Sequence, residues 1–205
     1  MIRIIELLRE EHREMEELLL VMEGELDIFN RQERPDYELL QAVISYFLDY
    51  PDCCHHPKED MIFEKLKVRS SAAAESVGEL EAEHRDEAVR LRQVEDVVRN
   101  ILLDHDIMPR QVFDRVVRDF IEHERVHIRM EERLFFPAAA KTLRPEDWAE
   151  IESRWNDTKD SLFNIGIEEK FHRANLGATW PNCALSAAFV RSHVVASTLP
   201  PPPIA

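Results

Sequence analysis

The chain has 205 residues, with 26 Lys and Arg against 41 Asp and Glu, and a net charge of −15. Its four glycines are few for this length, and Ala, Leu, Glu and Arg are plentiful, which predicts an all-α protein. So acidic a chain lacks the basic face that nucleic acid or an anionic lipid surface requires. No run of 18 apolar residues predicts a membrane span. We therefore expect no nucleic-acid partner, no membrane and, without a recognisable signal peptide, a cytoplasmic location.

Five helices are predicted from the spacing of apolar residues and from helix-breaking residues. They span about residues 2–29, 35–67, 73–103, 109–141 and 145–163. In the first helix, Leu8, His12 and Met15 recur at three- and four-residue steps, so His12 falls on the apolar face. The predicted connectors are short and polar, which is typical of neighbouring helices in a bundle.

The second helix contains Pro51, close to His55. A proline inside a helix removes one hydrogen bond and clashes with the preceding turn, so we expect a kink or bulge there. The alternative is that one helix ends near Tyr50 and another begins at Pro51. We favour the continuous, distorted helix.

Three parts of the chain are expected to differ in organisation. Residues 1–141 are predicted to form the helical bundle, 142–165 a short accessory helix, and 166–205 a C-terminal extension without clear periodicity. The extension either wraps the bundle or a partner chain, or stays partly disordered. It also offers a contact through which a homodimer could form.

A histidine and carboxylate pattern occurs twice in the chain. His12 is followed 43 positions later by His55, and Glu59 lies one helical turn beyond His55. His84, His127 and Glu131 repeat this order. Each lies 72 positions after its counterpart, which is His12, His55 and Glu59 respectively. Residues four apart on a helix point the same way, so each His-x-x-x-Glu pair presents a nitrogen and a carboxylate to one point.

The duplication favours a metal site over unrelated residues. A single histidine on an apolar face is more often a hydrogen-bonded core residue, and a single His-x-x-x-Glu pair is more often solvated. Two copies with the same internal spacing are not explained in this way. The predicted metal ligands are His12, His55, Glu59, His84, His127 and Glu131.

This donor set suits two ions, each with two histidines and with the glutamates bridging. Mixed nitrogen and oxygen donors suit iron, and manganese or zinc as substitutes, whereas calcium and magnesium prefer oxygen alone. An oxo or hydroxo bridge would complete the pair of ions.

Other candidate residues lie outside the repeat. His56 aligns with Ile128, and His123 precedes His127 by one turn. Either could orient a metal ligand, but we favour exposed positions at the rim. We interpret Cys53, Cys54 and Cys183 as free thiols in a reducing compartment, with a thiol ligand or sensor beside His55 as the alternative. His105, His172 and His193 are expected at the surface.

The motifs around these residues resemble the hemerythrin-like, HHE cation-binding family. The segments that carry the resemblance are Glu11-His12-Arg13, His55-His56-Pro57-Lys58-Glu59-Asp60-Met61-Ile62-Phe63, Glu83-His84-Arg85 and His127 to Pro137. The resemblance covers about residues 1–141. It implies an up-down antiparallel four-helix bundle around a non-haem di-iron centre, with the four histidines as terminal ligands and the two glutamates as bridges.

The sequence departs from the oxygen-carrying hemerythrins, which have a further histidine one turn from the third-helix ligand. Leu80 and Ala88 occupy those positions here, which argues against reversible oxygen carriage. We expect a di-iron protein that binds, senses or reduces a small ligand such as O2, NO or peroxide. The alternative is an iron-binding or iron-sensing module without turnover.

Overall fold

The computed structural model describes residues 2–78, 80–102 and 109–162. The predicted C-terminal extension lies outside the described residues, as do Cys183, His105, His172 and His193. The predictions made for them therefore stay predictions.

The described elements are all helical, as expected, and two of them, η1 and η2, are short π-helices. In chain order they are α1 (Arg3–Asn30), α2 (Tyr37–Tyr50), η1 (Pro51–His55), α3 (His56–Arg69), α4 (Ser71–Val77), α5 (Leu80–Leu102), α6 (Arg110–Met130), η2 (Glu131–Phe135), α7 (Phe136–Thr142) and α8 (Pro145–Leu162).

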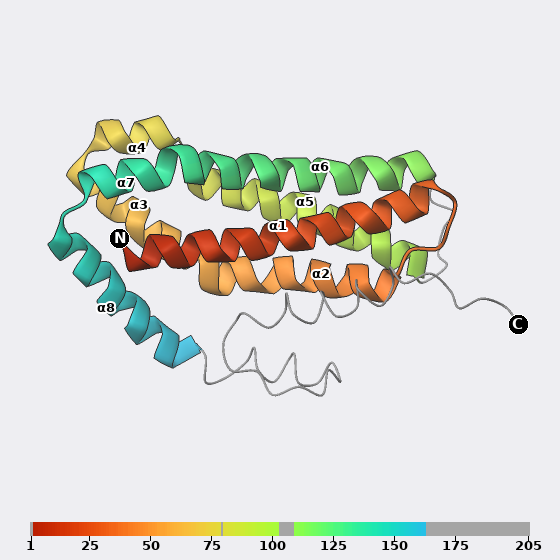
Figure 1. The fold of residues 1–205 in the computed structure, drawn as a ribbon, viewed down its shortest axis with the longest axis horizontal. Coiled ribbons are helices and arrows are strands. Elements are labelled where there is room, and N and C mark those ends of the chain that lie inside the picture. The colour runs from red at the N-terminus through yellow and green to blue at the C-terminus, as the bar shows by residue number, and fades with distance from the viewer. Residues whose placement is uncertain (1, 79, 103–108, 163–205) are drawn as a thin grey trace, which may run out of the picture.

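Helices α1, α2, α5 and α6 lie side by side along the molecule (Figure 1). Helix α1 packs against α6, α2 packs against α5, and α5 packs against α6. Helix α8 leaves one end of this bundle at an angle (Figure 1) and packs on α3. No helix in the described ranges is both long and apolar enough to cross a bilayer.

The second predicted helix is continuous through Pro51, as favoured, because η1 joins α2 directly to α3. The predicted bulge is a π-turn that ends at His55. A second π-turn, η2, begins at Glu131 and was not predicted. Pro137 lies just beyond it and has no N–H to donate to the preceding turn, so regular α-helical bonding cannot continue there. Both π-turns therefore adjoin predicted ligand residues.

The prediction of one helix over 73–103 is wrong. The chain forms α4 and α5, and Gly78, with φ of 97°, lies between them. Glycine adopts this left-handed region at little cost and commonly ends helices. Ser70 begins α4 by accepting a hydrogen bond from the Ala73 amide at 3.2 Å.

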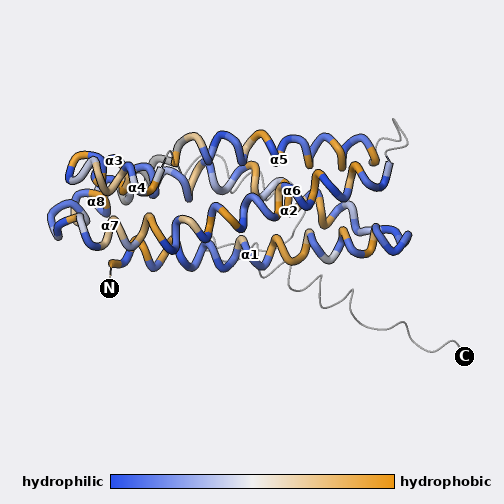
Figure 2. The backbone as a smooth tube through the Cα atoms, turned by 90° about the horizontal axis from the view of Figure 1, so that it is seen from above, coloured by the Kyte–Doolittle hydropathy of each residue, from blue (hydrophilic) through white to orange (hydrophobic). Residues whose placement is uncertain are grey.

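Two apolar clusters form the core. Along each long helix, buried polar residues separate the part that belongs to one cluster from the part that belongs to the other, and together they form a polar layer. One cluster includes Leu19, Phe47, Val94 and Phe120. The other includes Leu8, Ile62, Leu80 and Phe135. Figure 2 shows hydrophobic and hydrophilic residues interleaved along every helix. This layout places the buried polar residues in the interior, away from both ends of the bundle.

Candidate metal centre

The polar layer contains all six predicted ligands, and each of them is buried. His12 comes from α1, His84 from α5, and the two His-x-x-x-Glu pairs come from η1–α3 and from α6–η2. These residues lie on the inner faces because apolar residues precede and follow them at helical spacing. The structure arranges them, with one further histidine, in two groups whose ligand atoms lie within 4.8 Å of one another.

The first group consists of His12, His55, Glu59 and Glu131. The two histidines face each other, with 3.0 Å between their Nε2 atoms. Glu131 Oε2 lies 3.2 Å from His12 Nε2, and Glu59 Oε1 lies 3.3 Å from His55 Nε2. Two nitrogens and two carboxylates therefore converge on one point.

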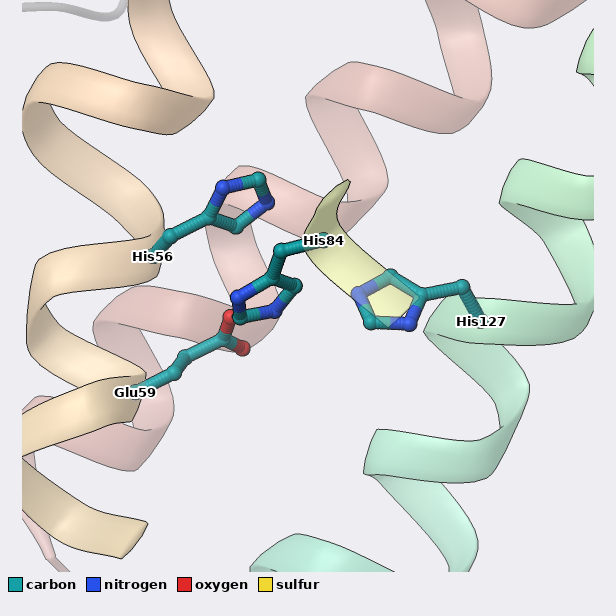
Figure 3. A group of neighbouring side chains, drawn as sticks. All are labelled: His56, Glu59, His84 and His127. Carbon is teal, nitrogen blue, oxygen red and sulfur yellow. The ribbon is translucent and has the colours of Figure 1, made fainter. Parts of the chain in front are cut away.

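The second group consists of His56, Glu59, His84 and His127. Figure 3 shows the Glu59 carboxylate directed at the His84 ring, with the His127 ring beyond it. His84 Nε2 lies 3.5 Å from Glu59 Oε2, and His127 Nε2 lies 3.1 Å from Glu131 Oε1. Glu131 Oε1 also lies 3.7 Å from His84 Nε2. Glu59 and Glu131 thus lie between the histidines of the two groups.

The rim position favoured for His56 is wrong. Its side chain is buried, belongs to the second group and stacks on His84 with 3.8 Å between ring centroids. The repeat could not reveal it, because the equivalent residue is Ile128. His123 is half-buried and belongs to neither group, and burial lowers the pKa of its imidazole.

Several atoms of the two groups are buried without a hydrogen bond of good geometry to any described residue. These atoms are both carboxylate oxygens of Glu59 and of Glu131, Nε2 of His84, and both ring nitrogens of His127. Buried polar groups are rarely left in this state, because each costs free energy. A cation held between them would satisfy the lone pairs of all these atoms except the one ring nitrogen of His127 that faces away.

The electrostatics of the layer depend on the same contacts. Burial opposes protonation of His12, His84 and His127, but contact with Glu131 and neighbouring carboxylates outweighs it and raises the pKa of each to about 10. Burial and Glu131 oppose ionisation of Glu59, yet His55 and His84 lower its pKa to about 2. Without metal, protons therefore occupy the positions that a cation would take.

Carboxylates outside the two groups lie beside the outer ring nitrogens of His12 and His84. Glu132 Oε1 lies 3.1 Å from His12 Nδ1, and Asp60 Oδ1 lies 3.9 Å from His84 Nδ1. Asp60 and Glu132 are themselves 72 positions apart. These two residues were not predicted, although the offset that relates the predicted ligands also relates them.

His55 has a different partner. Glu11 Oε2 lies 2.8 Å from His55 Nδ1, and Glu11 Oε1 accepts a short hydrogen bond from Lys58 Nζ. Lys58 is 1% exposed, which is rare for lysine. Burial opposes ionisation of Glu11, but His55 and Lys58 lower its pKa below the usual value.

A pair of acidic residues, Glu87 and Glu124, adjoins the second group and is also buried. Glu87 Oε2 lies 3.6 Å from His56 Nε2 and 4.0 Å from His127 Nε2. Burial and the neighbouring Glu124 raise the pKa of Glu87 to about 8. The repeat does not predict this pair, since the residue 72 positions before Glu87 is Met15.

Cys53 and Cys54 are free thiols, with 2.6 Å between their sulfur atoms. Neither belongs to a ligand group found among the described residues. The alternative of a thiol ligand beside His55 therefore has no support in the geometry.

The sequence pattern of the hemerythrin HHE cation-binding domain matches residues 3–139. The chain belongs to this family. The match runs from the start of α1 into α7 and includes all six predicted ligands. Comparison with characterised proteins gave no match, and neither did comparison with solved structures. Membership in the family supports binding of metal cations, for which the two His and Glu groups provide donors.

Proposed function

We propose that this protein holds two iron ions in the polar layer and binds, senses or reduces a small ligand there. The first ion would be held by His12 and His55, and the second by His84 and His127, with Glu59 and Glu131 shared. His56 is a further donor to the second ion. The observation that carries the proposal is the convergence of these buried side chains on two points, where the carboxylate oxygens of Glu59 and Glu131 and Nε2 of His84 and His127 have no hydrogen bond of good geometry to a described residue.

The donor chemistry supports iron. Imidazole with carboxylate suits iron, manganese and zinc, and the two groups include no thiolate, which structural zinc sites often use. A bound pair of iron ions would supply a redox-active Lewis acid able to accept O2, NO or peroxide. The protein's own part is to direct the imidazoles at two points, to bring two carboxylates between them, and to exclude bulk water from the layer.

We also infer an up-down antiparallel arrangement for the bundle. Along α1 and α5 the apolar cluster around Leu8 and Leu80 precedes the polar layer, and the cluster around Leu19 and Val94 follows it. Along α2–α3 and α6–α7 this order is reversed. Alternation of the order supports alternating directions. In this proposal residues 1–141 are the bundle, 142–165 the accessory helix and 166–205 a separate extension.

Metal analysis of the purified full chain tests the first part of the proposal. We expect two iron ions per chain, and an absorption band from ferric iron after reconstitution with ferrous iron and exposure to air. His55→Ala and His127→Ala should each lower the iron content. His123→Ala is the matched control, because His123 is half-buried on α6 but outside both groups. A chain without iron, or iron content that the ligand variants leave unchanged, would contradict the proposal.

The alternative function, iron binding or sensing without turnover, is separated by a second measurement. The reconstituted protein is mixed with O2, NO or peroxide, and consumption of each ligand is followed. Spectral change without consumption indicates binding or sensing, whereas steady consumption indicates reduction. If none of the three ligands changes the spectrum or is consumed, a small-ligand function is contradicted, and only iron binding remains of the proposal.

A further inference from the structure

Lys58 is the most unusual residue beside the proposed metal centre. Its side chain is almost wholly buried, and its ammonium group makes two contacts. Nζ donates to Glu11 Oε1, and it also lies 4.8 Å from the centre of the Trp155 ring. Lysine seldom occupies such a position unless its charge is paired. The carboxylate of Glu11 and the face of the indole together compensate for the lost hydration.

The contact continues from Glu11 to a proposed metal ligand. The second oxygen of Glu11 lies 2.8 Å from Nδ1 of His55. If Nδ1 carries the ring proton and donates a hydrogen bond to Glu11, the lone pair of the imidazole is on Nε2, which faces Glu59 and His12. Glu11 thereby orients the ring of His55, and the hydrogen bond from Lys58 in turn holds the Glu11 carboxylate in place.

The other half of the repeat lacks this arrangement. Met130 takes the place of Lys58, and Glu83, which takes the place of Glu11, is exposed. Nδ1 of His127 has no hydrogen-bond partner among the described residues. The lysine contact is therefore not required by the fold of a His-x-x-x-Glu helix, and it distinguishes one side of the centre from the other.

Trp155 belongs to α8, outside the residues that match the family. Helix α8 is attached to α3 by further contacts. Lys65 Nζ lies 2.6 Å from Glu150 Oε2, and Arg69 makes two hydrogen bonds to Asp147, of 2.8 and 2.7 Å. These ion pairs fix α8 against α3 where Trp155 can cover Lys58.

We propose that Lys58 is a positioning residue for His55, that Trp155 holds it in place, and that α8 is thereby part of the metal centre. This inference rests on the proposed function and adds to it. It assigns to the accessory helix an effect on one of the two ions only, namely the one held by His12 and His55. Replacement of groups that orient metal ligands lowers metal affinity by about 10- to 100-fold.

The test is a Zn²⁺ titration of the metal-free full chain, in which two ions bind per chain. Lys58→Met copies the residue of the other half, and we expect it to weaken one of the two binding steps by about 10- to 100-fold. Trp155→Leu should weaken the same step by less, and Lys58→Arg should restore most of the affinity. Lys65→Met is the matched control: it removes one ion pair between α3 and α8 but leaves both Arg69 hydrogen bonds to Asp147 and does not touch Glu11, so its affinity should stay near that of the parent.

A second readout follows His55 itself. NMR of the Zn²⁺-loaded protein with isotope-labelled histidine reports which ring nitrogen carries a proton. Lys58→Met should change the His55 signals and leave those of His84 and His127 in place. Equal weakening of both steps, unchanged affinity and His55 signals, or the same loss in Lys65→Met would each overturn the inference.

The outcomes separate the two proposals. If the parent protein binds no Zn²⁺, the proposed function fails and this inference fails with it. If the parent binds two ions and Lys58→Met binds them as tightly, only the inference fails. Should Lys58→Met not fold, as judged by circular dichroism, Trp155→Leu decides, since it leaves the polar layer unaltered.

Discussion

The two halves of the repeat have equivalent predicted ligands but differ in what surrounds them. In the first half, Glu11 and Lys58 connect His55 to the accessory helix. In the second half, His127 instead lies beside the buried Glu87, at 4.0 Å, and His56 of the first half joins its group. A cation site thus requires only a few donors at fixed spacing, while residues one contact further away are free to make the two sides unequal.

The largest effect expected within this comparison comes from the glutamates that both halves share. Glu59 contacts His12, His55 and His84, and Glu131 contacts His12, His84 and His127. Either Glu59→Ala or Glu131→Ala should therefore remove most of both ions, as measured by metal analysis.

Glu132→Ala serves as the control for this prediction. It removes a carboxylate that contacts His12 only on the outer nitrogen, so it should lower affinity by about 10- to 100-fold without abolishing binding. If either glutamate variant retained two tightly bound ions, that carboxylate would not be shared, and the halves would be independent sites.

A smaller effect is expected at the acidic pair that only the second half has. Burial and Glu124 raise the pKa of Glu87 from 4.5 to about 8. The folded state therefore favours the protonated acid. Its contribution to stability is fully present below pH 4.5 and is lost as the pH rises through about 8.

Glu87→Gln should accordingly stabilise the metal-free protein relative to the parent above pH 8, by about 1 to 3 kcal/mol. The gain should shrink as the pH falls toward 4.5. Urea unfolding at several pH values measures it. Glu83→Gln, at an exposed position on the same helix, should show no such dependence, and a pH-independent effect of Glu87→Gln would contradict the assignment.

The smallest effect concerns the helix break at Gly78, which is a further difference between the two halves. Gly78 adopts φ of 97°, whereas Glu6, which is 72 positions earlier, lies within α1. A Cβ at position 78 would meet no atom within 4 Å, so only the backbone conformation opposes a side chain. Gly78→Ala should destabilise the protein by about 1 kcal/mol.

Gly24→Ala is the counterpart of this variant, since Gly24 lies inside α1 and a Cβ there also meets no atom within 4 Å. It should stabilise the protein by about 0.5 to 1 kcal/mol. Thermal unfolding compares the two. A stabilising Gly78→Ala would mean that the chain tolerates a continuous helix there, as it does in the first half.

The helices and the convergence of six side chains were predictable because both follow from spacing along the chain. Apolar periodicity placed α1, α2–α3 and α6–α7 to within a few residues, and the 72-residue offset paired His12 with His84. The break at Gly78 was missed because apolar residues keep helical spacing on both sides of it, and a single glycine is tolerated in many helices.

The residues around the centre were harder to predict for a different reason. His56, Lys58 and Glu87 have no equivalents in the repeat, and a charged residue beside a ligand resembles any solvated residue in sequence alone. Their burial depends on packing between helices that are distant in the chain. Only the pair Asp60 and Glu132 carried a signal, because both members follow the offset.

The winding of η1 has a consequence for the number of donors that one helix can supply. Successive residues of a regular α-helix diverge by about 100°, so adjacent side chains do not normally share one face. Yet Cys54, His55 and His56 are all buried. Cys54 and His55 lie within η1, whose turn is wider than an α-turn, and His56 follows it directly. To the two groups, the first half thus supplies His55, His56 and Glu59 from this helix, while the corresponding helix of the second half supplies His127 and Glu131. The wider turn of η1 thus lets one helix of the bundle direct an additional imidazole, that of His56, into the polar layer, while the spacing of the repeat stays the same.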